Sequence, residues 1–303
     1  MLKIHKSLLE FFKIRYLPKI FQRITKNSIN LFLRGGDIIS IHPQLFGVHE
    51  ELIAAYIDYI AENGSSDFLI DIGANIGLSS CPSGNKFKKV YCFEPNPILV
   101  NILKSNLAIS LDEGVAEIFD FALGDSNGNY DLYIPKHNFG GAFIREGNDY
   151  SEEILSNKDN FNSFNHDNYI IRSVKVKNAE KVFGDLFSSL VSNNLTNGII
   201  KIDVEGFEKK VLSAIANSLP PSLNISVIFE NHYSAFDLNE IQNLFKHKKV
   251  RRFVFKRSIV EANKSKFRKY FELLFIGETF TLAQCNFDEK NIGSNKNVIL
   301  QID

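Results

Sequence analysis

The chain has no excess charge of either sign and very few cysteines. Its 303 residues include 35 lysines and arginines, 35 aspartates and glutamates, and 3 cysteines. Zero net charge gives no signal for a polyanionic partner, so we expect no nucleic acid partner. Cys81, Cys92 and Cys285 are scattered and odd in number, which argues against a disulfide framework or a zinc site. They fit a reduced, cytoplasmic protein with core thiols.

Long apolar runs are also absent. No stretch of about 18 apolar residues could form a transmembrane helix, and charge interrupts "SLLEFF" (7–12) too early for the core of a signal peptide. The hydrophobic content of 44% is nevertheless ordinary for a globular protein. The length allows one large domain with additions, or two domains.

Basic residues are concentrated in residues 1–34, which contain a single acid, Glu10. The pattern predicts one or two basic amphipathic helices, interrupted near Pro18. Two interpretations of their apolar face stay open. It could make peripheral contact with anionic lipid on the inner face of a membrane. It could instead pack on the rest of the chain or on a second subunit of a homo-oligomer.

Beyond this segment, the sequence predicts an α/β fold. A short strand and turn are expected at 36–47, and a helix at 49–64, which completes a lead-in region of residues 1–65. From 66 to 303 we expect one domain, in which short apolar strands alternate with helices, as in a parallel sheet. The strands are expected at 68–72, 90–93, 117–122, 199–203 and 225–230, and helices at about 96–110, 206–217 and 237–247. Polar residues at about 138–170 break the alternation and predict a lid or a disordered insertion.

The first strand runs into a glycine-punctuated loop, "FLIDIGANIGLSS" (68–80). Gly73 and Gly77 would let the backbone approach a ligand at the carboxyl edge of the sheet. The loop has neither the middle glycine of dinucleotide loops nor the lysine of phosphate-binding loops. Asp71 and Asn75 stand where a phosphate would otherwise lie. The loop therefore favours a cationic or zwitterionic ligand.

Glu94 follows the second strand in "VYCFEPNP" (90–97), about twenty residues after the loop. An acid at this position hydrogen-bonds the two ribose hydroxyls of a nucleoside and repels a 2′-phosphate. Together the two motifs describe an adenosyl group with an amino-acid tail and no phosphates, which is S-adenosylmethionine. The competing interpretation is that the glycines only form a tight turn and that Glu94 is a surface acid.

Four blocks together resemble the FkbM family of S-adenosylmethionine-dependent methyltransferases: "DIGANIG" (71–77), "FEPNP" (93–97), "ALGDSNG" (122–128) and "KIDVEGFE" (201–208). The resemblance implies a Rossmann-like class I methyltransferase fold. Its sheet is mostly parallel, usually of seven strands with the last antiparallel, and carries helices on both faces; here an N-terminal helical extension is added. It also implies methyl transfer to a hydroxyl, often of a sugar or a polyketide-type natural product.

The resemblance also assigns cofactor residues by position. It implies that the methionine end of the cofactor is lined by Asp71, Gly73, Asn75 and Gly77, the ribose by Glu94, and the adenine by Asn96, Ala122 and Leu123. Pro82, in "SSCPSG" (79–84), departs from the pattern and predicts a short first crossover helix.

Candidate catalytic residues follow the fourth and fifth strands: Asp203, Glu205, Glu230, Asn231 and His232. A base among them would help to remove the hydroxyl proton. Asp203 ranks first, because an acid at the end of a buried strand is costly without a role. His232 is either the base or a surface residue. Asp203, Glu230 and Asn231 also offer oxygen ligands for Mg²⁺, which the family pattern does not require.

Three other functions stay open. Methyl transfer to nitrogen, on a small amine or an amino sugar, would use the same cofactor residues. A non-catalytic S-adenosylmethionine-binding partner of a glycosyltransferase would not need acids at the strand ends. An NAD-dependent oxidoreductase is disfavoured by the missing glycine. The small-molecule or glycan acceptor is expected to contact residues 42–50, residues 138–144 and the C-terminal third.

Overall fold

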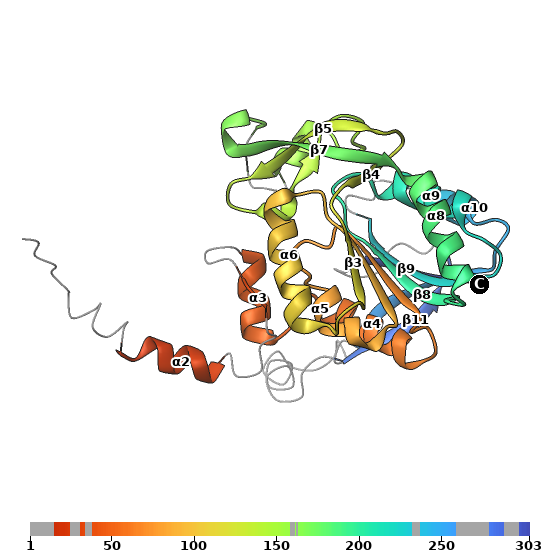
Figure 1. Cartoon of the computed structure of the whole chain (residues 1–303), viewed down its shortest axis with the longest axis horizontal. Helices are drawn as coiled ribbons and strands as arrows, with labels where there is room; N and C mark the ends of the chain where they lie inside the picture. Colours follow the sequence, from red (N-terminus) through yellow and green to blue (C-terminus); the bar gives the residue numbers. More distant parts are fainter. Residues whose placement is uncertain are drawn as a thin grey trace, which may run out of the picture.

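An eight-stranded sheet with helices on both faces forms the centre of the protein (Figure 1). The computed structural model describes residues 15–24, 31–33, 38–157, 161, 163–231, 237–258, 279–287 and 297–303. The strand order across the sheet is β11-β10-β12-β9-β8-β1-β2-β3. The α/β fold predicted from the sequence is confirmed.

Five parallel strands make up one side of this sheet: β1 (Phe68–Ile72), β2 (Lys89–Phe93), β3 (Ala116–Phe119), β8 (Asn197–Ile202) and β9 (Asn224–Glu230). The other side is formed by β10 (Val250–Ser258), β11 (Thr279–Cys285) and β12 (Asn297–Ile302). The last strand, β12, lies antiparallel between β9 and β10, as the resemblance implies. The antiparallel edge strand β11 is an eighth strand, beyond the usual seven.

Alternate residues of β1 pack into two different apolar clusters. Phe68, Ile70 and Ile72 pack in one cluster with α8, α9 and α10, and Leu69 packs in the other with α4, α5 and α6. The helices of the first face are α8 (Ala179–Ser192), α9 (Glu208–Ser218) and α10 (Leu238–Leu244), and those of the second are α4 (Glu51–Glu62), α5 (Ser80–Ser83) and α6 (Pro97–Ser110). Burial on both faces explains why the strand is a nearly unbroken apolar run.

A second, four-stranded sheet lies beyond the carboxyl ends of β1 and β2 (Figure 1). Its order is β4-β7-β5-β6, with β4 (Ala122–Gly124), β5 (Gly128–Pro135), β6 (Phe143–Ile144) and β7 (Tyr169–Asn178). Short helices lie in its connections: η2 (Phe139–Gly141), α7 (Glu152–Asn157) and η3 (His166–Asn168). The described part of the polar stretch 138–170 contributes only β6 and the start of β7 to this second sheet, and otherwise forms its connections.

Two local predictions are wrong. Where the structure describes it, from residue 38 on, the segment 36–47 is not a strand and turn, because α3 (Ile38–Phe46) is a helix that buries Ser40 and Pro43 and ends before Gly47, whose φ is 84°. Burial of one helix side overrides the strand preference of an isoleucine-rich segment. The strand expected at 117–122 is divided between the two sheets, with exposed Asp120 in the break.

Other local predictions are confirmed. Helix α4 occupies the expected segment, and α5 has only four residues, as Pro82 predicts. Although α4 falls in the lead-in region, it packs in the core of the sheet. In α2 (Leu17–Ile24), Pro18 stands in the first turn, where proline is tolerated. No helix among the described residues is long and apolar enough to cross a membrane.

Candidate active site

The loop after β1 brings the ends of β1 and β8 into direct contact. Gly73, Asn75 and Gly77 all have positive φ, at 81°, 54° and 90°. A Cβ atom on Gly73 would lie only 1.9 Å from the backbone oxygen of Asp203. A Cβ atom on Gly77 would instead meet the buried Cys81 at 2.5 Å from its Sγ. Gly73 therefore permits the approach of the two strands, and Gly77 permits packing beneath the loop.

Glu94 holds the loop from the neighbouring strand. Its carboxylate accepts hydrogen bonds from the backbone N–H groups of Asn75 and Asn96, both at 2.8 Å. The side chain of Glu94 is buried, which raises its pKa to about 7, although the two N–H groups act in the opposite direction. Each oxygen keeps lone-pair capacity beyond its one backbone bond. Glu94 can therefore still accept hydrogen bonds from two ligand hydroxyls.

A largely apolar cavity lies beside Glu94, with about 750 Å³ of space when its solvent-open mouth is included. Ala122 and Leu123, the residues expected near an adenine, line this cavity. The segment from η2 to β6 also contributes to the lining. Aromatic and aliphatic side chains in the lining are Phe93, Leu99, Phe121, Leu132, Phe139, Phe143, Ile144 and Phe207. A flat apolar ring with a hydroxylated sugar beside it fits this set of walls.

A second, polar cavity adjoins the first, with about 650 Å³ of space when its solvent-open mouth is included. The two cavities share part of their lining: Gly73, Asn75, Gly140, Asp203 and Glu205. Charged side chains that line the polar cavity are Glu50, Lys201, Asp203, Glu205 and Glu230, and His49 lies among them. Two ligands, one in each cavity, would therefore meet at the ends of β1 and β8.

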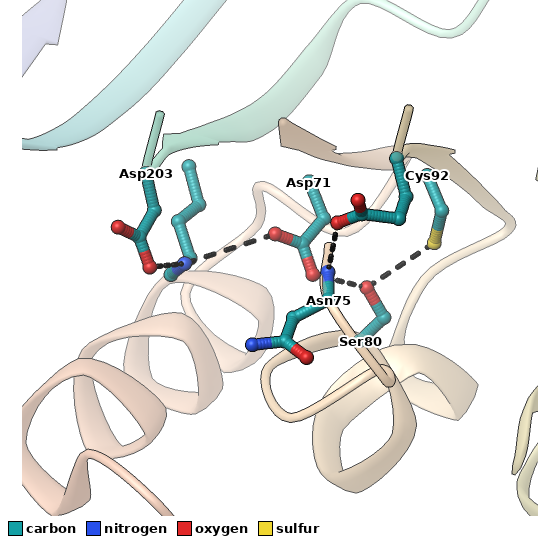
Figure 2. Close-up of polar contacts among 7 residues, drawn as sticks. Asp71, Asn75, Ser80, Cys92 and Asp203 are labelled. Atoms are coloured by element: carbon teal, nitrogen blue, oxygen red, sulfur yellow. Dashed lines mark hydrogen bonds and ion pairs between the residues drawn. The ribbon is translucent and has the colours of Figure 1, made fainter. Parts of the chain in front are cut away.

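Lys201 is a buried cation between two carboxylates. Its ammonium donates a hydrogen bond to Asp203 at 2.9 Å and lies 3.9 Å from Asp71. Burial alone would lower the pKa of Lys201, but Asp203 and Asp71 outweigh it and raise that pKa. On its other oxygen, Asp71 accepts a hydrogen bond from Ser80 at 2.5 Å (Figure 2). Sequence reasoning assigned Lys201 no role, although a lysine inside an apolar strand needs a partner.

Three of the predicted cofactor residues lie behind the cavity walls. Asp71 is fully buried and bonds Ser80 rather than facing either cavity. Asn96 caps α6 by accepting from the N–H of Ile98, and it donates to the backbone oxygen of Phe139. Gly77 packs on Cys81. These residues shape the site through their neighbours.

The remaining predicted residues divide into two groups. Asp203, Glu205 and Glu230 line the polar cavity. Asp203 is not the buried acid we expected, because 46% of its side chain is exposed and Asp71 is the buried one. Asn231 is buried next to Glu230, and His232 lies outside the described residues.

The described residues give no support to a magnesium site. Among them, no group of three or more His, Cys, Asp or Glu side chains is arranged to hold a metal ion. The ammonium of Lys201 already supplies a positive charge to Asp203, the first of the proposed ligands.

This combination of fold, loop and carboxylate defines a class I S-adenosylmethionine-dependent methyltransferase. A family model described as the methyltransferase FkbM domain matches residues 71–258, well over half of the chain. The protein therefore belongs to the FkbM methyltransferase family. It is similar to methyltransferase sdnD of Sordaria araneosa, with 26% identity over 178 residues, which cover 55% of this chain and 68% of the relative.

Two solved methyltransferases also show a distant likeness. The precorrin-6y C5,15-methyltransferase of Geobacter metallireducens is 8% identical, with 91% of this chain and 95% of that chain covered and a TM-score of 0.40. The magnesium protoporphyrin IX methyltransferase of Synechocystis, with bound SAM, is 7% identical, with 99% of both chains covered and a TM-score of 0.39. Scores this low carry no conclusion, so the assignment rests on the family match and the strand order.

Proposed function

We propose that the protein transfers a methyl group to a hydroxyl of a sugar, in a glycan, a nucleotide sugar or a glycosylated natural product. The observation that carries the proposal is the wall shared by the two cavities, at Gly73, Asn75, Gly140, Asp203 and Glu205. A cofactor in the apolar cavity and an acceptor in the polar cavity would meet there. Such positioning alone can supply several kcal/mol of the barrier reduction.

Each part of the apolar cavity fits one part of S-adenosylmethionine. Glu94 would accept hydrogen bonds from the ribose hydroxyls, and Ala122 and Leu123 would contact the adenine. Gly73 and Asn75 would lie at the methionine end. The bound cofactor supplies an electrophilic methyl group on a cationic sulfur, and Asp203 and Glu205 place negative charge near it.

Carboxylates of the polar cavity suit an acceptor rich in hydroxyls. Glu50, Asp203, Glu205 and Glu230 come from three separate parts of the chain and can each accept hydroxyl hydrogen bonds. The acids in this lining outnumber its one lysine, which also favours a second candidate, methyl transfer to an amine or amino sugar. Either acceptor would fit a role in polysaccharide or natural-product synthesis on the cytoplasmic side of a membrane.

Two measurements test the proposal. Calorimetry should show binding of S-adenosylhomocysteine and none of NAD. S-adenosylmethionine labelled in its methyl group should then label 4-nitrophenyl hexosides, with the methylated atom located by mass spectrometry. Transfer only to the nitrogen of 4-nitrophenyl amino-hexosides would favour the second candidate. If S-adenosylhomocysteine does not bind, the proposed function is wrong.

A further inference from the structure

Glu50 reaches the polar cavity from outside the part of the chain that matches the family. It stands at the N-terminus of α4, before residues 71–258. Glu50 lines the polar cavity but not the apolar one, so it faces the acceptor side only. The groups that act on its carboxyl lie at the ends of three strands: Lys201 in β8 and Asp203 just after it, Glu230 in β9, and Asn297 of β12, which hydrogen-bonds it.

A general base is most effective when its pKa lies near the working pH. It is then ionised before the reaction and can still bind the proton that it removes. The pKa of Glu50 is raised to about 7: burial is the largest effect, Asp203 and Glu230 act in the same direction, and Lys201 and Asn297 oppose them. Asp203 is in a different position. One oxygen of its carboxylate already accepts a hydrogen bond from the buried ammonium of Lys201, so that oxygen is engaged with a cation.

We propose that Glu50 is the general base that takes the proton of the acceptor, which rests on the methyl transfer proposed above. The acceptor oxygen forms its bond to the methyl carbon while its proton passes to the carboxylate of Glu50. The carbon–sulfur bond breaks, and its electron pair stays on sulfur as a neutral thioether. Asp203, paired with Lys201, is left to orient the acceptor.

The first test needs no acceptor. Calorimetry compares the affinity for S-adenosylmethionine, a sulfonium cation, with that for the neutral S-adenosylhomocysteine, at roughly pH 6 and roughly pH 8, on either side of the pKa. An ionised Glu50 close to the methyl group favours the cation, so the affinity ratio should rise about fivefold between the two pH values. Glu50→Gln should give a flat ratio. Glu50→Asp, which keeps the charge, should still show the rise.

Two matched variants control for other effects. Glu51 is an exposed neighbour in the first turn of α4, so Glu51→Gln should behave like the wild type. His49 lines the same cavity and is measured as His49→Gln. A rise that persists in Glu50→Gln and disappears in His49→Gln overturns the proposal. Failure of the wild type to bind either ligand would refute the proposed function instead, which separates the two results.

Turnover gives a second readout with the 4-nitrophenyl hexosides as acceptors. Glu50→Gln should lower turnover by about a hundredfold while leaving the affinity for S-adenosylhomocysteine nearly unchanged, as for a lost base. At saturating S-adenosylmethionine, where ionisation of Glu94 does not limit cofactor binding, the acidic limb of the pH profile, near pH 7 in the wild type, should disappear. Wild-type turnover with an intact acidic limb in this variant would show that another group takes the proton.

Discussion

Lys201 and Asp71 are directly paired in the register of β8 and β1, with their charged groups 3.9 Å apart. Both side chains are buried, and the same ammonium donates to Asp203 at the mouth of the cavity. A single cation therefore compensates a fully buried acid and positions an exposed one. This pair connects the core of the sheet to the place where the two cavities meet.

Removing this cation should destabilise the fold. Lys201→Met would leave the carboxylate of Asp71 buried without its partner, at a cost of about 3–5 kcal/mol in the free energy of unfolding. Lys209→Met is the control, because Lys209 pairs with Glu240 at the surface and its loss should cost less than about 1 kcal/mol. Urea unfolding measures both. Equal losses for the two variants would show that Asp71 does not depend on Lys201.

Any side chain at position 73 should destabilise the protein, and Gly114 provides the comparison. Gly73→Ala places a methyl group 1.9 Å from the backbone oxygen of Asp203, whereas Gly114, with a similar φ of 79°, has nothing within 4 Å. Gly114→Ala should cost only the left-handed strain, about 1–2 kcal/mol. Gly73→Ala should cost clearly more and abolish binding of S-adenosylhomocysteine. Similar losses of stability in the two variants would mean that the approach of the strands is not what requires Gly73.

Sequence patterns predicted the elements that form because of residues within the element itself. The apolar run of β1, the helix at 49–64 and the short α5 all follow from residues within the element. The second sheet was missed because β4, β5 and β7 pair across long separations, and 138–170 reads as polar loop. Helix α8 could have been found, since Asn178 caps it by accepting from the N–H of Lys181.

Binding of the cofactor should depend on the charge of Glu94. In Glu94→Gln, an amide NH₂ group replaces one acceptor oxygen, so either a backbone N–H or a ribose hydroxyl loses its acceptor. The affinity for S-adenosylmethionine should fall by about 1–3 kcal/mol. Glu113→Gln, at an exposed position before β3, is the matched control. Calorimetric affinity within experimental error of the wild type would remove Glu94 from the cofactor site.

The ionisation of Glu94 should also appear in the stability of the protein. Its pKa rises from an ordinary 4.5 to about 7 on folding, so the folded state favours the protonated acid. The contribution of the protonated Glu94 to the free energy of unfolding is complete below about pH 4.5 and is lost as the pH rises through about 7. Relative to Glu94→Gln, the wild type should therefore lose on the order of 3 kcal/mol of unfolding free energy across this window.

Urea unfolding at a series of pH values compares the two proteins. S-adenosylhomocysteine should reduce the loss in the wild type, because ribose hydroxyls would stabilise the carboxylate. Parallel stability curves for wild type and Glu94→Gln would contradict the raised pKa.

The sequence could not predict contacts between side chains that come from distant elements. Asp71 and Asn96 belong to recognisable blocks, but they act behind the cavity walls through Ser80 and Phe139. Glu50 belongs to no block, and only folding brings it beside Asp203 and Glu230. A motif identifies residues near a ligand, whereas burial and register decide which of them face it.

The last prediction concerns the basic segment 1–34. Leu17 of α2 is half-buried, but 46% of Ile20 and 46% of the preceding Tyr16 are exposed, together with basic Lys19 and Arg23. Exposed apolar and basic side chains on one helix suit anionic lipid.

The full-length protein should therefore float with anionic vesicles at low salt and be released at high salt. Deleting residues 1–34 should abolish flotation and leave S-adenosylhomocysteine binding intact. A protein that stays with the soluble fraction, and whose mass in solution falls from dimer to monomer on this deletion, would assign the segment to subunit contact instead.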